Sequence, residues 1–215
     1  MVDLIHGLRP ERVQANLERV RAEIAAAGRA GQVEVLAAVK YVPVQELEAL
    51  AQGGVTLVGE NRAQDLVAKA DAYPGRFTWD FIGHLQSRKV RQILPYVRYI
   101  HSVASDSVLL RLERHAPPET EVMIEINISG EPGKSGIAPA ELEAFIERCP
   151  VTVVGLMTMP PLASRAEESR PYFAALRALA ERHGLRELSM GTSQDYLVAV
   201  QEGATIVRLG TSLYT

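Results

Sequence analysis

The chain has 215 residues and a formal net charge of -3 at pH 7, and 47% of its residues are hydrophobic. This composition is typical of a globular protein with one sizeable core, and it gives no electrostatic reason to expect nucleic acid or a membrane surface as a partner. The single cysteine, Cys149, excludes an internal disulfide and a cysteine-based metal site. No signal peptide pattern or membrane-spanning apolar run is present in the sequence, so a reducing cytoplasm is the expected location.

Two sequence patterns alternate along the chain. Residues 11–28 have the 3.6-residue apolar spacing of an amphipathic helix and end on Gly28. Short apolar runs, typical of buried parallel strands, then alternate with helical patterns. The predicted strands are 33–39, 56–60, 78–83, 97–103, 120–128, 151–159, 187–191 and 205–213. The predicted helices between them are 44–54, 62–72, 87–96, 106–116, 138–149, 165–184 and 195–204.

This alternation predicts an α/β fold. Alternation alone fits both an open doubly wound sheet and a closed barrel. Eight strands in one uninterrupted series favour the (β/α)8 TIM barrel, and the extra N-terminal helix is expected to cover the gap left by a missing helix after the last strand. Because no linker or shift in composition divides the chain, residues 1–215 are predicted to form a single domain.

Polar residues collect directly after the predicted strands, at the rim where such barrels carry their sites. Lys40 follows the first strand, Asn61 the second and His84 the third. Residues 189–195, "SMGTSQD", follow the seventh strand, and "RLGTS" at 208–212 ends the eighth.

The loops after the last two strands contain the parts of a phosphate site. Gly191 lets the backbone approach a ligand closely, and Ser193 supplies a hydroxyl. Gly210 and Thr211 add backbone amides and a second hydroxyl. Taken alone, Ser193 is better explained as the N-cap of a helix that begins near Asp195. Two adjacent loops with the same chemistry favour the phosphate site.

Lys40 across the rim indicates Schiff-base chemistry with a phosphorylated carbonyl compound. A lysine with a pKa of about 10.4 is almost fully protonated at neutral pH. Burial at a strand end would lower this pKa, and Arg62 or Arg208 nearby would act in the same direction. A surface lysine, or one paired with Glu60, is an equally good interpretation of Lys40 by itself.

Eight motifs in order resemble those of the pyridoxal-phosphate homeostasis proteins, relatives of the barrel domain of alanine racemase. They are "AAVKYVP", "GENRAQD", "WDFIGHLQSRK", "HSVASDS", "INISGEPGKSG", "GLMTMPP", "LSMGTSQD" and "VRLGTSL". The resemblance covers about residues 8 to 214 and implies pyridoxal 5'-phosphate as the cofactor, held by Lys40 as an internal aldimine. No metal is implied.

The resemblance also implies roles for six other residues. Ser193, Gly210 and Thr211 match the positions that hold the phosphate. Arg208 matches the arginine that faces the pyridine nitrogen. Asn61 matches an asparagine near the ring hydroxyl, and Met157 is expected on or near the ring face.

An arginine opposite the pyridine nitrogen affects how strongly the cofactor ring withdraws electrons. Arg208 does not give up its proton, so it keeps that nitrogen unprotonated and makes the ring a poorer electron sink. The related racemases work with an arginine there as well, and what they add is a second domain and an opposing catalytic tyrosine. The chain stops at Thr215, right after the eighth strand, which is expected to leave no room for the second domain of a racemase. The resemblance therefore implies a carrier without catalytic residues, which influences vitamin B6 and amino-acid pools and can pass the cofactor to apo-enzymes. A monomer is expected.

Two enzymatic alternatives remain open. A racemase-like enzyme would need a proton carrier, for which the candidates are Asp80, His84, Tyr41 and Ser87. A cofactor-free aldolase would use Lys40 directly on a sugar phosphate.

Overall fold

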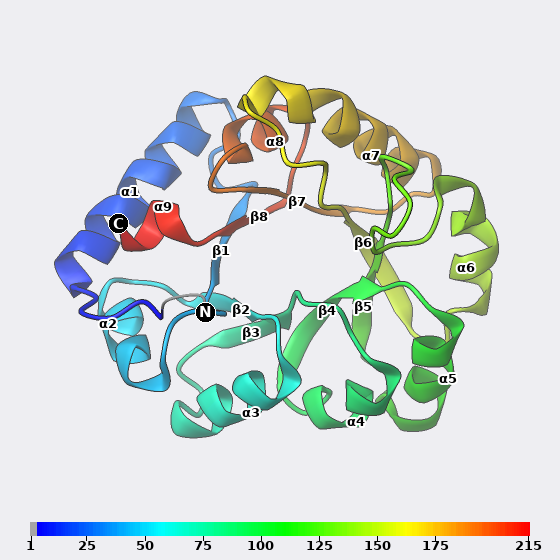
Figure 1. The fold of residues 1–215 in the computed structure, drawn as a ribbon, viewed down its shortest axis with the longest axis horizontal. Helices are drawn as coiled ribbons and strands as arrows, with labels where there is room; N and C mark the ends of the chain where they lie inside the picture. The colour runs from blue at the N-terminus through cyan, green and yellow to red at the C-terminus, as the bar shows by residue number, and fades with distance from the viewer. Residues whose placement is uncertain (1–3) are drawn as a thin grey trace.

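A computed structural model of the chain describes residues 4–215 as a closed barrel of eight parallel strands in sequence order (Figure 1). The last strand pairs with the first, where Leu36 lies opposite Arg208 and Ala37 opposite Leu209. The predicted (β/α)8 TIM barrel is therefore confirmed. The strands are β1 (Glu34–Ala38), β2 (Leu57–Glu60), β3 (Thr78–Phe81), β4 (Val97–Val103), β5 (Glu121–Glu125), β6 (Thr152–Met157), β7 (Glu187–Thr192) and β8 (Ile206–Leu209).

A ring of helices surrounds the barrel, as Figure 1 shows. They are α1 (Pro10–Ala26), α2 (Leu47–Gln52), α3 (Ala63–Ala72), α4 (Val90–Ile93), α5 (Asp106–His115), α6 (Leu142–Arg148), α7 (Arg170–Arg182), α8 (Tyr196–Gln201) and α9 (Thr211–Tyr214). Four of the connections begin with a 3-10 turn, namely η1 (Val44–Glu46), η2 (Ser87–Lys89), η3 (Pro139–Glu141) and η4 (Ala166–Ser169). No helix in the described part of the chain is long and apolar enough to cross a membrane.

Several predicted elements are shorter in the structure than in the sequence pattern, and four of the predicted helices are divided into a 3-10 turn and an α-helix. The helix predicted over 165–184 is divided into η4 and α7, because Pro171 fits only the first turn of a helix. The strand predicted over 205–213 ends at Leu209, and residues 211–214 form α9 instead.

Helix α1 packs on the outside of the barrel between α9, which follows β8, and α2. Helix α1 lies beside α9 (Figure 1), and the Asn16 side chain donates hydrogen bonds to the carbonyls of Leu213 and Thr215 at 3.2 and 3.1 Å. Helix α1 covers this position as predicted, but the expected absence of a helix after the last strand is wrong, because α9 follows β8. On its other side α1 packs against α2 at Gly53, where a Cβ would lie 2.7 Å from Val13.

The barrel interior is divided between apolar and polar side chains. A small apolar cluster inside the barrel consists of Leu36, Leu57, Met123, Val154 and Ile206. The interior also holds buried polar residues, which are Asp80, His101, Glu125, Ser189 and Arg208. These polar side chains place charge beneath the C-terminal rim, where a barrel carries its site.

The close approach at Gly53 leads to a prediction about stability. Gly53 has a φ of -74° that alanine also adopts, so Gly53→Ala would ordinarily stabilise the chain slightly. Here the added methyl meets Val13, and we expect Gly53→Ala to lower the free energy of unfolding by about 1–3 kcal/mol. Urea unfolding measures the change, with the exposed neighbour Gln52→Ala as control. A stabilised Gly53→Ala variant would contradict the tight α1–α2 contact.

Candidate functional site

A pocket of about 350 Å³ opens at the C-terminal ends of the strands, and we call it the central pocket. Six of the seven residues predicted to bind a cofactor line it. They are Lys40, Asn61, Ser193, Arg208, Gly210 and Thr211. These residues come from the segments that follow β1, β2 and β7 and from the end of β8, so the barrel closure brings together positions up to 171 residues apart (40 to 211).

Met157, the seventh predicted residue, does not line the central pocket. It lies opposite Glu125 on β5 and Ser189 on β7, and its side chain is 2% exposed inside the barrel. Met159 lines the pocket in its place, and its sulfur lies 2.8 Å from Nη2 of Arg208. The predicted contact of Met157 with a ring face is therefore not supported.

Ser193 joins the two loops that were predicted to bind phosphate. Its Oγ accepts hydrogen bonds from the backbone amides of Gly210 and Ser212, both at 3.2 Å. It is not an N-cap, because α8 begins after Asp195, whose carboxylate accepts from the Thr192 amide at 2.7 Å. The loops after β7 and β8 thus meet at one hydroxyl at the edge of the central pocket.

The two glycines of these loops have different roles. Gly191 has a φ of +90°, and a Cβ there would lie 2.6 Å from Ala199, so glycine is needed to pack the β7–α8 turn. A Cβ on Gly210 would meet no atom within 4 Å. The backbone at Gly210 is therefore open to a ligand.

Lys40 extends from the end of β1 with its Nζ 4.7 Å from the centre of the Tyr41 ring. Its side chain is exposed, as in the surface-lysine interpretation, so burial does not act on its amine in this structure. The Tyr214 hydroxyl donates to the carbonyl of Ala38 at 3.0 Å and fixes the strand just before Lys40. Burial raises the pKa of Tyr214, so this hydroxyl stays neutral and keeps its proton for that bond.

Glu60 pairs with Lys69 and not with Lys40, which excludes the ion pair considered from the sequence. Nζ of Lys69 lies 2.5 Å from Oε1 of Glu60 and 2.7 Å from the carbonyl of Val39. Oε2 of Glu60 accepts from the backbone amides of Asn61 and Arg62. Both side chains are buried, and together they fix the backbone on either side of the central pocket. Sequence reasoning missed Lys69, although its position on the apolar face of α3, three residues after Leu66, was a signal.

Arg208 lies at the floor of the central pocket and is held by atoms of β6 and β7. Its Nη1 donates to the carbonyl and to Oγ of Ser189, each at 2.6 Å, and its Nη2 donates to the carbonyl of Thr158 at 2.9 Å. Burial lowers the pKa of Arg208 to about 10, while the charges of Glu125 and Asp195 act in the opposite direction. The guanidinium therefore remains protonated at neutral pH.

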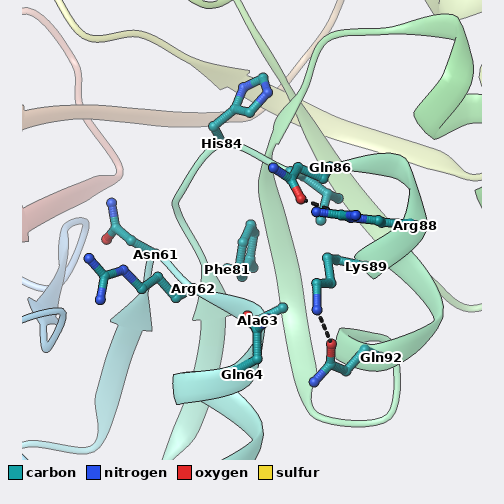
Figure 2. A pocket seen from close by; sticks show the side chains of 11 residues that line it. Asn61, Arg62, Ala63, Gln64, Phe81, His84, Gln86, Arg88, Lys89 and Gln92 are labelled. Atoms are coloured by element: carbon teal, nitrogen blue, oxygen red, sulfur yellow. Dashed lines mark hydrogen bonds between the residues drawn. The ribbon is translucent and has the colours of Figure 1, made fainter.

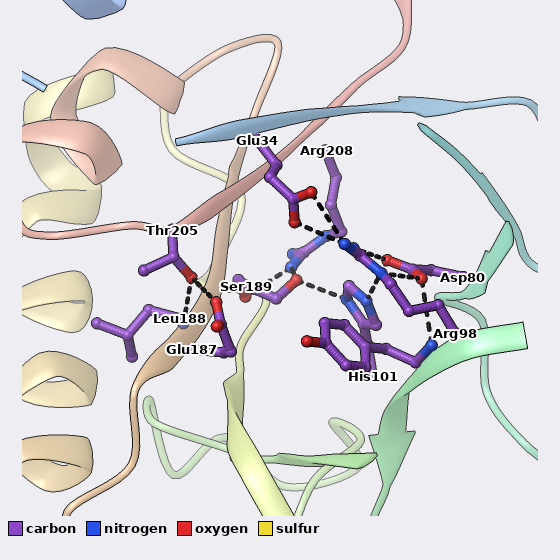
Figure 3. A network of polar contacts seen from close by, with 10 residues as sticks. Glu34, Asp80, Arg98, His101, Glu187, Leu188, Ser189, Thr205 and Arg208 are labelled. Carbon is purple, nitrogen blue, oxygen red and sulfur yellow. Dashed lines mark hydrogen bonds and ion pairs between the residues drawn. The ribbon is translucent and has the colours of Figure 1, made fainter. Parts of the chain in front are cut away.

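A chain of polar contacts runs from Arg208 through the barrel interior (Figure 3). Oγ of Ser189 lies 2.8 Å from Nδ1 of His101, and Nε2 of His101 lies 3.0 Å from Oδ2 of Asp80. Arg98 then bridges Asp80 and Glu34, with its closest contact to each at 2.8 Å. The chain thus connects the pocket floor to Glu34 at the first residue of β1.

The buried members of this chain have shifted pKa values. Burial lowers the pKa of His101, and the opposing effect of Asp80 does not offset it. For Asp80, burial alone would raise the pKa, but hydrogen bonds and charges from His101 and Arg98 lower it. We infer a neutral histidine between an ionised Asp80 and the serine that holds Arg208.

The candidates for a proton carrier lie in different places. Tyr41 lines the central pocket, whereas Asp80 is enclosed in the interior chain below it. His84 lines a neighbouring pocket, and Ser87 begins η2. Residues 4–215 contain no group of three or more His, Cys, Asp or Glu side chains that could bind a metal ion.

The fold and the site define a (β/α)8 barrel in which a lysine after β1 lines one pocket with the loops after β7 and β8. The family described as alanine racemase, N-terminal domain, matches residues 8–215. The chain is also 37% identical to the pyridoxal phosphate homeostasis protein of Aquifex aeolicus, over 95% of this chain and 96% of the relative. The chain therefore belongs to the pyridoxal phosphate homeostasis proteins within the alanine racemase N-terminal domain family, which confirms the resemblance seen in the sequence.

Two solved structures superpose on this chain. PipY of Synechococcus elongatus, determined with pyridoxal phosphate (PLP) bound, is 30% identical and superposes with a TM-score of 0.80, covering 94% of this chain and 100% of PipY. Alanine racemase from Corynebacterium glutamicum shares the fold, with a TM-score of 0.75 at 16% identity. That similarity covers 99% of this chain and 63% of the racemase.

The Glu60–Lys69 pair leads to a second prediction about stability. Lys69→Met leaves a carboxylate buried without its cation, and we expect it to lower the free energy of unfolding by roughly 3–5 kcal/mol. Urea unfolding measures this change. Lys134→Met is the matched control, because Lys134 pairs with Glu131 on the surface and should cost less than about 1 kcal/mol. If both substitutions changed the free energy of unfolding equally, the Glu60–Lys69 pair would not stabilise the fold more than a surface pair does.

The lowered pKa of His101 predicts a pH dependence of stability. Below pH about 6.5 an unfolded histidine takes up a proton that buried His101 does not, so the unfolded state binds more protons. The stabilisation is present above this pH and is lost as the pH falls, by up to about 1.4 kcal/mol per pH unit. Urea unfolding between about pH 7.5 and pH 5.5 should show a shallower slope for His101→Asn than for the wild type. The exposed His115→Asn should keep the wild-type slope.

Proposed function

We propose that the central pocket binds pyridoxal 5'-phosphate, and that the protein holds and carries this cofactor. The observation that carries the proposal is the convergence of Lys40, Ser193, Gly210 and Arg208 on one pocket at the barrel rim. The structure of PipY with PLP bound supports it, because PipY aligns with nearly the whole chain.

The groups that line the pocket fit the parts of this cofactor. The open backbone at Gly210 and the hydroxyl of Ser193 suit a phosphate. Oδ1 of Asn61 is buried without a hydrogen-bond partner among the described residues, and Asn61 lines the pocket, so it has unused capacity for a polar ring substituent. The amine of Lys40 would condense with the aldehyde to form a Schiff base, with release of one water.

Arg208 fits a carrier, in which the bound ring need not be a strong electron sink. Its guanidinium is an obligate donor that remains charged at neutral pH, so a pyridine nitrogen facing it accepts a hydrogen bond and stays unprotonated. An unprotonated ring withdraws electrons from an attached amino acid less strongly. Ser189 and Thr158 prevent Arg208 from turning away, because they hold both of its terminal nitrogens.

The proton carriers expected of a racemase give little support to the alternative. Of the four candidates only Tyr41 lines the central pocket, and its ring lies next to Lys40. The carrier proposal includes effects on vitamin B6 and amino-acid pools and delivery to apo-enzymes. The cytoplasmic location and the monomeric state expected from the sequence stay predictions.

Removal of Lys40 tests the proposal. We expect wild-type protein mixed with PLP to show a Schiff-base absorbance band, and borohydride reduction followed by peptide mapping to label Lys40. Lys40→Ala should lose the band and the label, and Lys40→Arg should behave like Lys40→Ala because a guanidinium does not form the imine. Lys134→Ala, which alters a lysine paired with Glu131 in the loop after β5 and outside the lining of the central pocket, should retain the band.

Two results would contradict the proposal. A label on Lys69, Lys89 or Lys134 in wild-type protein would remove Lys40 as the anchor. Fast exchange of an amino acid's α-proton with solvent deuterium, at catalytic protein concentrations, would show an enzyme instead of a carrier.

A further inference from the structure

A second and larger pocket, of about 570 Å³, lies beside the central pocket, and we call it the side pocket (Figure 2). Its walls are the loop from β2 into α3 and the loop from β3 into α4. The first loop, with the start of α3, contributes Asn61, Arg62, Ala63 and Gln64 to the lining, and the second contributes Arg88 and Lys89. Asn61 lines both pockets, so the two are neighbours across one side chain.

The side pocket is positively charged. Arg62, Arg88 and Lys89 line it, and none of its described lining residues is an aspartate or glutamate. Arg88 and Lys89 donate only to the neutral side chains of Gln86 and Gln92, at 3.2 and 3.3 Å (Figure 2). Within residues 4–215 neither cation has a carboxylate partner, although the chain has more acidic than basic residues.

The walls of the side pocket are fixed before any ligand arrives. A Cβ on Gly83 would lie 2.1 Å from the carbonyl oxygen of Asn61, so the two loops are in backbone contact. Oγ of Ser102 donates to the carbonyl of Gly83 at 2.5 Å, and Glu60 holds the amides of Asn61 and Arg62 from below. Because this backbone is already fixed, a ligand has to order only the cationic side chains, which lowers the cost of binding.

The N-terminal turn of α3 adds to this charge. Ala63 and Gln64 belong to this turn and line the side pocket, and the helix has no side-chain N-cap. Its unpaired amides and its dipole favour an anion at the same place as the cations. An anion with several acceptor oxygens satisfies two cations and a helix terminus better than a single carboxylate does.

We propose that the side pocket is a binding site for a small phosphomonoester, separate from the proposed cofactor site. The phosphate lies between Arg88, Lys89 and the first turn of α3, and the remainder of the ligand extends toward Asn61. A nucleic acid is not the ligand this pocket suits, because the charge is confined to one concavity on a chain of net charge -3.

Calorimetry with pyridoxine 5'-phosphate tests this site. That probe has no aldehyde and cannot react with Lys40. The central pocket is first filled with PLP and fixed with borohydride, and we expect one further equivalent of the probe to bind. Arg88→Gln/Lys89→Gln should weaken this binding by at least about tenfold, because two charge-assisted hydrogen bonds are lost.

The matched control removes two charges elsewhere. Arg91 and Arg111 are exposed on α4 and α5 and do not line the side pocket, so Arg91→Gln/Arg111→Gln should change the affinity by less than about twofold. Equal weakening by both pairs, no binding of the probe, or tighter binding of a single-stranded oligonucleotide would each overturn the site.

The test separates this site from the proposed function. If PLP does not label the wild-type chain, the proposed function fails, and the side pocket is then titrated in the unloaded protein with inorganic phosphate. The same tenfold difference between the two double variants is expected there, and equal affinities would overturn the site.

Discussion

The buried pair of Glu60 and Lys69 is the contact on which the rest of the rim depends. One carboxylate oxygen receives the ammonium, and the other receives the backbone amides of Asn61 and Arg62. The ammonium also binds the carbonyl of Val39, the residue before Lys40. A single ion pair thus sets the relative position of the proposed anchor and of the wall shared by the two pockets. A buried pair is a costly way to gain stability, so its value here lies in specifying geometry.

The chain of polar contacts from Arg208 to Glu34 fixes the position of the Arg208 charge, as the Glu60–Lys69 pair fixes the backbone of the rim. A guanidinium at a pocket floor would be free to turn toward solvent or to pair with Glu125. Ser189 and Thr158 prevent this by accepting hydrogen bonds from Arg208, and His101, which contacts Asp80, holds Ser189 in turn. Because these groups are enclosed in a medium of low polarity, each one's orientation constrains the next. The charge presented to the central pocket is therefore a property of the whole barrel interior.

Strand order and rim chemistry could be predicted from the sequence because both are local patterns. The run that ends at Lys40 and the loops at Ser193 and Gly210 follow apolar strands, and closure of the barrel brings them together without further information. The Lys69 pair could not be predicted, because helical periodicity does not say which carboxylate lies opposite a buried lysine. The choice between Met157 and Met159 depends on where β6 ends, and strand ends are set by register with β5 and β7.

The two proposed sites would bind the same kind of ligand with different interactions. At the central pocket the loops at Ser193 and Gly210 offer hydroxyl and backbone groups, which are neutral and little affected by salt. At the side pocket the donors are the cations Arg88 and Lys89, and Arg88 is exposed, so salt screens their attraction. A site with a buried cation at its floor and a proposed covalent link favours long residence, whereas an exposed, screened cationic site favours rapid exchange. With Asn61 between them, the proposed arrangement combines a holding site with an exchange site on one barrel rim.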